Sequence, residues 1–125
     1  MMMEFKNSKG IFQQIADNLC DRILSGEFKV GDKVPSVREQ AANLGVNHNT
    51  IMRTYNELQR DNIITNKRGI GYFVAEKAPD QILEMRRQEF FEQTMPEIVH
   101  QVDLLNIKKS EVKPLITKLE ENENQ

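Results

Sequence analysis

Two short helices joined by a tight turn are the feature that most restricts how this 125-residue chain can fold. Ser36 is positioned as a helix N-cap, and Glu39 follows it at the capping-box spacing. Gly45 ends this helix, because glycine readily adopts the left-handed conformation found at helix C-termini. Asn47 then caps a second helix that extends to about Arg60. These helix-capping and helix-terminating residues predict a helix-turn-helix.

The second of these helices divides into an apolar and a polar face. Ile51, Tyr55 and Leu58 recur at helical spacing and predict a buried stripe, and Val46 is placed to form a hydrophobic staple with Ile51. The opposite face carries Asn49, Met52, Arg53 and Asn56. The helix opens with four hydrogen-bonding side chains, which are Asn47, His48, Asn49 and Thr50. Since one capping residue is enough, this crowding suggests a surface that recognises a polar partner.

An amphipathic helix precedes this pair, and a β-hairpin follows it. The preceding helix has apolar residues four positions apart, at Ile11, Ile15, Leu19 and Ile23, and it stops near Gly26. In the capped helix that follows, Val37, Ala41 and Leu44 are expected to face inward. Two β-rich runs, Ile63–Thr65 and Tyr72–Val74, predict a hairpin whose tip carries Lys67, Arg68 and Gly69. Together these elements outline a winged helix-turn-helix.

The chain beyond Pro79 is helical in pattern. One helix ends around Phe91, a second continues beyond Pro96, and Ser110 is placed to cap a third. These segments contain too few residues to enclose a core, so we expect their apolar faces to pack against a second copy of the chain. The predicted fold is mainly α with a small β-hairpin. It consists of a winged helix-turn-helix over residues 1–77 and a helical dimerisation tail over residues 78–125.

Charge is distributed unevenly between these two parts. The formal net charge of the whole chain is −2, which by itself does not indicate a nucleic-acid partner. Residues 1–77 contain 11 Lys and Arg against 9 Asp and Glu, whereas residues 78–125 contain 6 against 10. The front is therefore mildly basic and the tail acidic, and this distribution allows an anionic partner at the front.

The absence of several sequence motifs indicates where the protein is located and whether it is an enzyme. No apolar run approaches the roughly 18 residues of a membrane helix, and the first residues have no apolar segment typical of a signal peptide. A single cysteine, Cys20, excludes an internal disulfide and suits a reducing cytoplasm. Cys20, His48 and His100 are too dispersed for a metal site, and no nucleophile or phosphate-loop motif occurs. We therefore expect a cytoplasmic protein that is not an enzyme, binds no cofactor or metal and has no membrane association. The successive Met1, Met2 and Met3 leave the true start open.

From Ile11 to Ala75 the sequence resembles the DNA-binding domain of the GntR family of bacterial transcription regulators. The resemblance is carried in order by "LSGEFKVGDKVPSVRE", "LGV", "NT", "YNEL" and "GYFV", and it covers just over half of the chain. The short helical tail resembles the YtrA-like subgroup, whose members have a small dimerisation region in place of a large ligand-binding domain. The resemblance implies a homodimer that binds double-stranded DNA.

The resemblance also implies roles for individual residues. An arginine early in the first helix of the pair contacts DNA in this family, the start of the following helix enters the major groove, and the wing tip enters the adjacent minor groove. The DNA-contacting residues predicted on this basis are Ser36, Arg38, Asn47, His48, Asn49, Thr50, Arg53, Lys67, Arg68 and Gly69. Arg38 can pair bidentately with guanine and an asparagine with adenine, which contributes about 1–3 kcal/mol of discrimination for each pair. Gly69 lets the backbone approach the groove.

Two positions depart from the family pattern. Many members have arginine where this chain has His48, and often another where it has Met52. Losing two permanent charges is expected to weaken the attraction to phosphates and to change the preferred operator. Met52 could instead meet a thymine methyl group.

Several of these residues also have simpler explanations. Asn47 and Ser36 can use their side chains to cap their own helices. His48 and Met52 can be ordinary exposed residues, and Lys67 with Arg68 can be a solvated hairpin tip.

The predicted function is a sequence-specific transcription regulator, in particular a homodimeric repressor on a palindromic operator, with activation as the other mode. The alternative is a winged-helix module that binds another protein and has no operator. The two differ in salt dependence, because only a DNA-binding protein releases counterions from neutralised phosphates. The tail shows no evident pocket, so an unknown small-molecule effector would bind between subunits or at the domain junction.

Overall fold

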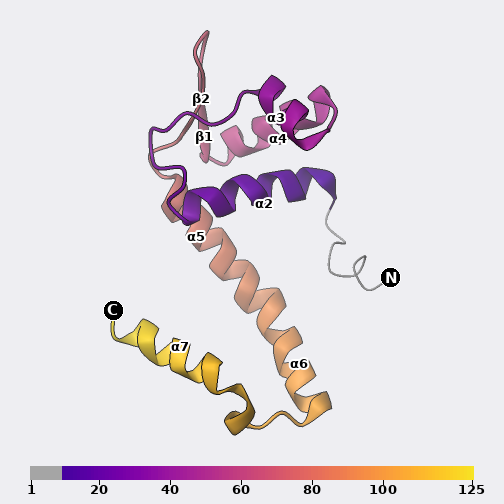
Figure 1. The fold of residues 1–125 in the computed structure, drawn as a ribbon, viewed down its shortest axis with the longest axis vertical. Helices are drawn as coiled ribbons and strands as arrows, with labels where there is room; N and C mark the ends of the chain where they lie inside the picture. The colour runs from indigo at the N-terminus through magenta and orange to yellow at the C-terminus, as the bar shows by residue number, and fades with distance from the viewer. Residues whose placement is uncertain (1–9) are drawn as a thin grey trace. The chain divides into compact units, whose positions relative to one another are not determined.

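The computed structural model describes residues 10–125, which fall into two compact units, one ending at Met85 and one beginning at Arg86. The first unit contains α2 (Ile11–Leu24), α3 (Val37–Leu44), α4 (His48–Arg60), β1 (Ile64–Lys67), β2 (Gly71–Val74) and the first part of α5 (Ala78–Glu89) (Figure 1). The second unit contains the rest of α5, the π-helical turn η1 (Phe90–Thr94), α6 (Met95–Leu105), the 3₁₀ turn η2 (Lys109–Val112) and α7 (Lys113–Glu123). The predicted fold, mainly α with one β-hairpin, is confirmed.

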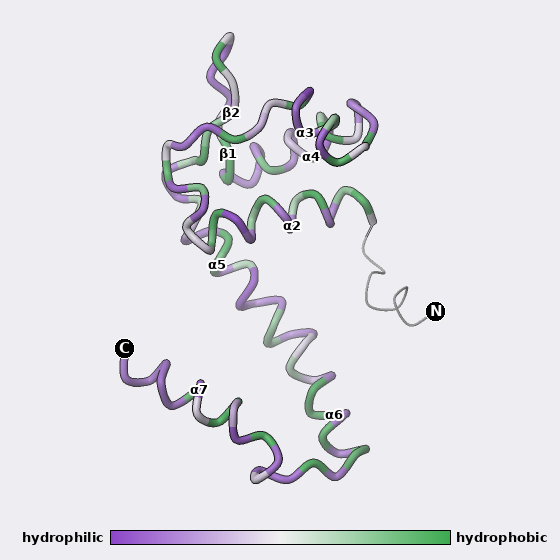
Figure 2. The backbone as a smooth tube through the Cα atoms, in the orientation of Figure 1, coloured by the Kyte–Doolittle hydropathy of each residue, from purple (hydrophilic) through white to green (hydrophobic). Residues whose placement is uncertain are grey.

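The core of the first unit is formed by one face of each long helix together with the hairpin. The apolar stripes predicted for α2 and α4 are buried, from Ile15 to Ile23 in α2 and from Ile51 to Leu58 in α4. Ile11, at the first turn of α2, is the exception with 46% exposure. Figure 2 shows apolar and polar positions alternating along α2, as this one-sided burial requires.

The inward face of α3 differs from the predicted one at its C-terminal end. Val37 is buried and Ala41 packs against the core, but Leu44 is 43% exposed. Gln40 takes the remaining buried position and is only 2% exposed. Leu44 is the last residue of α3, and the chain turns away immediately after it at Gly45 (φ +64°). The prediction of Leu44 as a core residue is therefore wrong.

The hairpin has a third partner that the sequence pattern did not indicate. β1 and β2 pair antiparallel, with Thr65 opposite Phe73 and Lys67 opposite Gly71. The loop between α2 and α3 runs along the other side of β2, where Lys33 forms a bridge with Phe73 and the Val34 N–H donates to the Tyr72 carbonyl over 2.9 Å. Because an isolated two-stranded hairpin is marginal in water, this third segment supports the wing.

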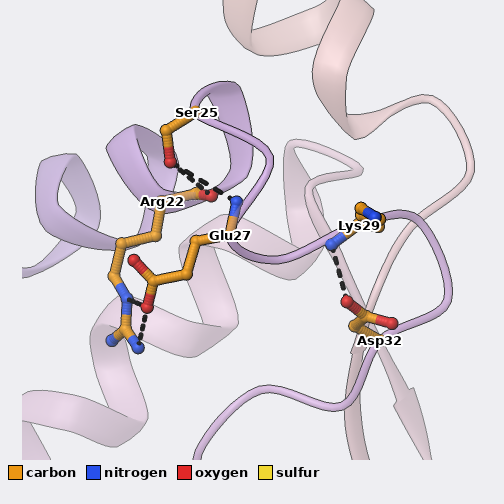
Figure 3. A network of polar contacts seen from close by, with 5 residues as sticks. All are labelled: Arg22, Ser25, Glu27, Lys29 and Asp32. Atoms are coloured by element: carbon orange, nitrogen blue, oxygen red, sulfur yellow. Dashed lines mark hydrogen bonds and ion pairs between the residues drawn. The ribbon is translucent and has the colours of Figure 1, made fainter.

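A local polar network holds that loop in place (Figure 3). The Arg22 guanidinium donates to the Glu27 carboxylate over 2.8 Å and lies 4.3 Å from the centroid of the Phe28 ring. Further along, the Lys29 N–H donates to the Asp32 carboxylate over 2.8 Å. These contacts close the turn that delivers residues 31–34 to the edge of β2.

The second unit exposes most of its apolar surface. Its helices have no buried residues among those that the structure describes. The exposed apolar side chains are Phe90, Phe91, Met95, Ile98, Val99, Val102, Leu104, Leu105, Leu115 and Leu119. The unit therefore does not enclose a core of its own, and the predicted dimerisation through it stays a prediction.

Two details of the second unit concern its helices. Pro96 directly follows η1, and Thr94 and Met95 before it have α-helical dihedrals, so Pro96 removes one N–H donor from a helix that continues across it. The predicted cap at Ser110 is wrong, because Ser110 lies inside η2 and α7 begins only at Lys113. The Glu111 carboxylate accepts from the Lys108 N–H over 2.8 Å, so the chain is capped two residues earlier than Ser110. No described helix combines the length and the apolar character that crossing a bilayer would need.

The buried amide of Gln40 gives a test of the packing between α3 and the core. Its Nε2 has no hydrogen-bond partner among the described residues, and such a buried donor costs about 1–3 kcal/mol. We expect Gln40→Leu to raise the free energy of unfolding by about that amount, measured by urea denaturation. The matched control is Gln59→Leu, at an exposed position of α4, which should change stability by less than about 0.5 kcal/mol. A Gln40→Leu protein less stable than the wild type would contradict this assignment.

Candidate nucleic-acid interface

The start of α3 is closed by a complete capping box. The Ser36 hydroxyl accepts from the Glu39 N–H over 3.1 Å, and the Glu39 carboxylate accepts from the Ser36 N–H over 2.9 Å. The capping role predicted for Ser36 is confirmed. Arg38 lies in the same first turn with its side chain exposed. The capping box therefore fixes the start of the helix from which the Arg38 side chain extends into solvent.

The carboxylate of this box is electrostatically stabilised. The pKa of Glu39 lies below its ordinary value of 4.5, first because of the hydrogen bond from the Ser36 N–H, then because of the Ser36 hydroxyl and the charge of Lys33. Glu39 therefore remains ionised and keeps the cap closed throughout the neutral range.

The start of α4 is capped by Asn47. Its side-chain oxygen accepts from the Asn49 N–H over 2.7 Å, and its carbonyl accepts from the Thr50 N–H over 3.0 Å. His48 and Asn49 are exposed beside the cap, whereas Thr50 is half-buried. The cap uses only the oxygen of the Asn47 amide, whose nitrogen carries two further donors. Capping and contact with a partner are therefore compatible at Asn47.

Arg53 lies one turn further along the exposed face of α4, and its side chain contacts α2. Its guanidinium carbon is 4.3 Å from the centroid of the Phe12 ring, a cation–π distance. Phe12 is half-buried in the first turn of α2. The contact restricts the rotamers of Arg53 before any partner arrives. Sequence reasoning missed Phe12, because nothing in the pattern of α2 links it to a residue on α4.

Tyr55 connects the two helices to the wing. Its side chain is fully buried, and its hydroxyl donates to the Pro35 carbonyl, over 2.7 Å, directly before α3. Its ring meets the ring of Tyr72, on β2, edge to face with 5.0 Å between centroids. Burial raises the pKa of Tyr55 well above its ordinary value of 10, so the hydroxyl keeps its proton and remains a donor.

The tip of the wing carries exposed cations around a glycine turn. Lys67 is the last residue of β1, and its ammonium lies 4.6 Å from the centroid of the Phe73 ring. Arg68 and Gly69 form the turn, in which Gly69 has φ +78°, a conformation that strains other residues. Ile70 follows with 62% exposure and donates its N–H to the Lys67 carbonyl over 2.9 Å.

The predicted contact residues all lie at the surface of the first unit. In the view of Figure 1, α3 and the hairpin both lie above α2. Only Ser36 and Thr50 are half-buried, and the exposed members of the set are Arg38, Asn47, His48, Asn49, Arg53, Lys67, Arg68 and Gly69. They supply amide donors and acceptors together with four permanent cations, groups that suit base edges and phosphates. Among the described residues no group of His, Cys, Asp or Glu is suited to hold a metal ion, and Cys20 is buried.

Comparison with known proteins agrees with this arrangement. Residues 11–74 match the family model of the bacterial regulatory proteins, gntR family. The HTH-type transcriptional regulator YhcF of Bacillus subtilis is 40% identical over 109 residues, which cover 87% of this chain and 88% of that protein. The HTH-type transcriptional repressor YtrA of the same organism is 39% identical over 79 residues, covering 63% of this chain and 61% of that protein.

Solved structures show the same similarity. A GntR-family transcriptional regulator from Bacteroides thetaiotaomicron gives a TM-score of 0.67 at 37% identity, covering 91% of this chain and 99% of that one. A GntR-family regulator from Listeria monocytogenes gives 0.67 at 31% identity, covering 90% and 96%. These relatives are transcription regulators and not enzymes. The resemblance stated from the sequence and the non-catalytic interpretation are therefore confirmed.

The capping box at α3 predicts a defined pH dependence. Since the folded-state pKa of Glu39 is lowered, its carboxylate stabilises the fold above the ordinary pKa of 4.5, and this contribution is lost as the pH falls below that value. We expect Glu39→Gln to be less stable than the wild type at pH 7 and the two proteins to converge towards pH 3. Urea denaturation across this range measures the difference. A difference that stays constant with pH would show that the charge of Glu39 plays no part.

Proposed function

We propose that this chain, which belongs to the gntR family of bacterial regulatory proteins, is a homodimeric repressor that binds a palindromic DNA operator. The observation that supports this most directly is the exposed polar start of α4 beside the capped start of α3. A dimer presents two such surfaces to two-fold-related half-sites about one or two helical turns apart. The relative YtrA is described as a repressor, which favours repression here.

The proposed contacts divide between two grooves. The start of α4 enters the major groove, where Asn47, His48, Asn49 and Thr50 face base edges and phosphates. Arg38 pairs with a guanine from the start of α3, while Arg53 lies further along the groove on the face held by Phe12. The wing tip, with Lys67, Arg68 and Gly69, lies in the adjacent minor groove.

The proposed dimer forms through the second unit. Its exposed apolar side chains have no core of their own, and burial of such surface contributes about 25 cal/mol for each Å² removed from water. A second copy of the same unit offers an equally apolar surface, which suits an isologous interface. This assigns DNA contact to the first unit and dimerisation to the second unit, which begins at Arg86 within the predicted tail of residues 78–125.

The DNA-binding proposal is tested by a mobility shift on the chain's own upstream DNA and on genomic fragments selected by the protein. We expect a symmetric footprint and an affinity that falls steeply with salt. Arg38→Ala should weaken the specific complex by about 1–3 kcal/mol, because a bidentate base contact is lost. Arg60→Ala, which removes an exposed arginine at the opposite end of α4, is the matched control and should retain specificity.

The alternative function predicts a different result in the same assay. A winged-helix module that binds a protein would select no genomic fragment and would show no salt-dependent operator complex. That outcome, with the fold intact by circular dichroism, would overturn the proposal.

The dimer proposal is tested by sedimentation of the purified protein. Val102 is a 40%-exposed apolar residue of α6, so Val102→Asp removes apolar surface and adds a charge without disturbing a core. We expect the wild type to sediment as a dimer and Val102→Asp as a folded monomer. Glu97→Gln, an exposed change on the same helix, should remain dimeric. A monomeric wild type at tens of micromolar would contradict the proposal.

A further inference from the structure

We infer that Lys33 contacts a DNA phosphate between the two grooves and joins the wing to the start of α3 in one binding surface. This inference rests on the proposed DNA-binding function and adds to it a residue outside the predicted contact set. Lys33 lies in the loop before α3, where the sequence pattern shows only a turn.

The backbone of Lys33 is fixed against the wing. Lys33 forms an antiparallel bridge with Phe73, and the flanking residues continue the pairing. The Gly31 N–H donates to the Val74 carbonyl over 3.0 Å, and the Val34 N–H donates to the Tyr72 carbonyl over 2.9 Å. Val34 is buried while Lys33 is exposed, as alternation along a strand requires. The backbone of Lys33 is therefore paired with β2 of the wing, although Lys33 precedes the wing in the sequence.

The side chain of Lys33 lies on the same face as Lys67. Lys33 is opposite Phe73, Lys67 is opposite Gly71, and the two β2 residues are two positions apart, so all four share one face. A Cβ atom added to Gly71 would lie 2.9 Å from Cε and 3.6 Å from Nζ of Lys33. The missing side chain of Gly71 thus provides the space in which the Lys33 stem lies. Lys67 in turn places its ammonium 4.6 Å from the centroid of the Phe73 ring.

The charge of Lys33 also acts on the start of α3. The pKa of Glu39, the carboxylate of the capping box beside Arg38, is lowered first by the hydrogen bonds from Ser36 and, to a smaller extent, by the charge of Lys33. One ammonium thus lies against the wing and within electrostatic range of the helix that carries Arg38. When protein elements occupy adjacent grooves, the sugar-phosphate backbone runs between them, and cations there bind phosphate oxygens. A lysine in this place neutralises a phosphate and carries no base preference.

The experiment measures binding of full-length wild type, Lys33→Gln, Lys33→Arg and Lys77→Gln over a range of salt. Two probes are used, the duplex upstream of the chain's own coding sequence and an unrelated duplex of equal length. Lys77 is an exposed lysine beyond β2, away from the wing tip, and controls for loss of one charge. Lys33→Gln keeps the backbone pairing and most of the stem, and melting curves confirm that each variant is folded.

We expect Lys33→Gln to weaken binding several-fold on both probes and to reduce the slope of log affinity against log salt by about 0.9 for each protomer. Lys33→Arg should restore the wild-type slope. A Lys33→Gln slope equal to those of the wild type and Lys77→Gln, while Arg38→Ala weakens the specific complex as expected, would overturn this inference alone. A wild type that binds neither probe nor any genomic fragment would overturn the proposed function together with it.

Discussion

A hydrogen bond from the Tyr55 hydroxyl to the Pro35 carbonyl ties together the parts of the first unit that carry its surface chemistry. Tyr55 is anchored in α4, Pro35 directly precedes the cap of α3, and the edge of the same ring meets Tyr72 on the wing. Tyr55 is fully buried, so this bond also gives its hydroxyl a partner inside the protein. One buried side chain of α4 therefore contacts both the residue before the α3 cap and the wing.

The exposed residues on this frame are held in place by contacts of several kinds. Arg53 lies on a ring from α2, and Lys67 lies on a ring from β2. The side-chain oxygen of Asn47 caps its own helix, and its amide nitrogen can still donate to a partner. Long side chains lose rotamer freedom when they bind, at about 0.5–1.5 kcal/mol for each one immobilised. Contacts already present in the free protein remove part of that cost from binding.

Local rules predicted the helix ends of the first unit well and its tertiary contacts poorly. The cap at Ser36, the glycine end at Gly45 and the cap at Asn47 depend on residues a few positions apart, so the sequence displays them directly. The same rules failed at Ser110, where a 3₁₀ turn intervenes before α7. Leu44 was predicted to be buried but is exposed, because it is the last residue of α3. Gln40 is buried instead, which its hydropathy did not indicate.

Part of the candidate site could be predicted from the sequence and part could not. The polar helix starts and the wing tip were visible in the sequence. The family resemblance assigned DNA-contacting roles to them, and these roles stay predictions. The contacts of Phe12 with Arg53 and of Lys33 with the wing bring together residues distant along the chain. No periodic pattern or cap signal marks such pairs, so only the folded structure shows them.

The start of α5 has a consequence for how the protein is made. Ala78 and Ile82 are buried in the same core as residues of α2, although they come last in the first unit. A ribosome delivers the chain from its N-terminus, so the part of the core that Ala78 and Ile82 cover stays uncovered until α5 has been synthesised and released. During that interval the nascent chain presents apolar surface that chaperones can bind. The winged part of this protein therefore completes its folding only after the chain has passed the last strand of the wing.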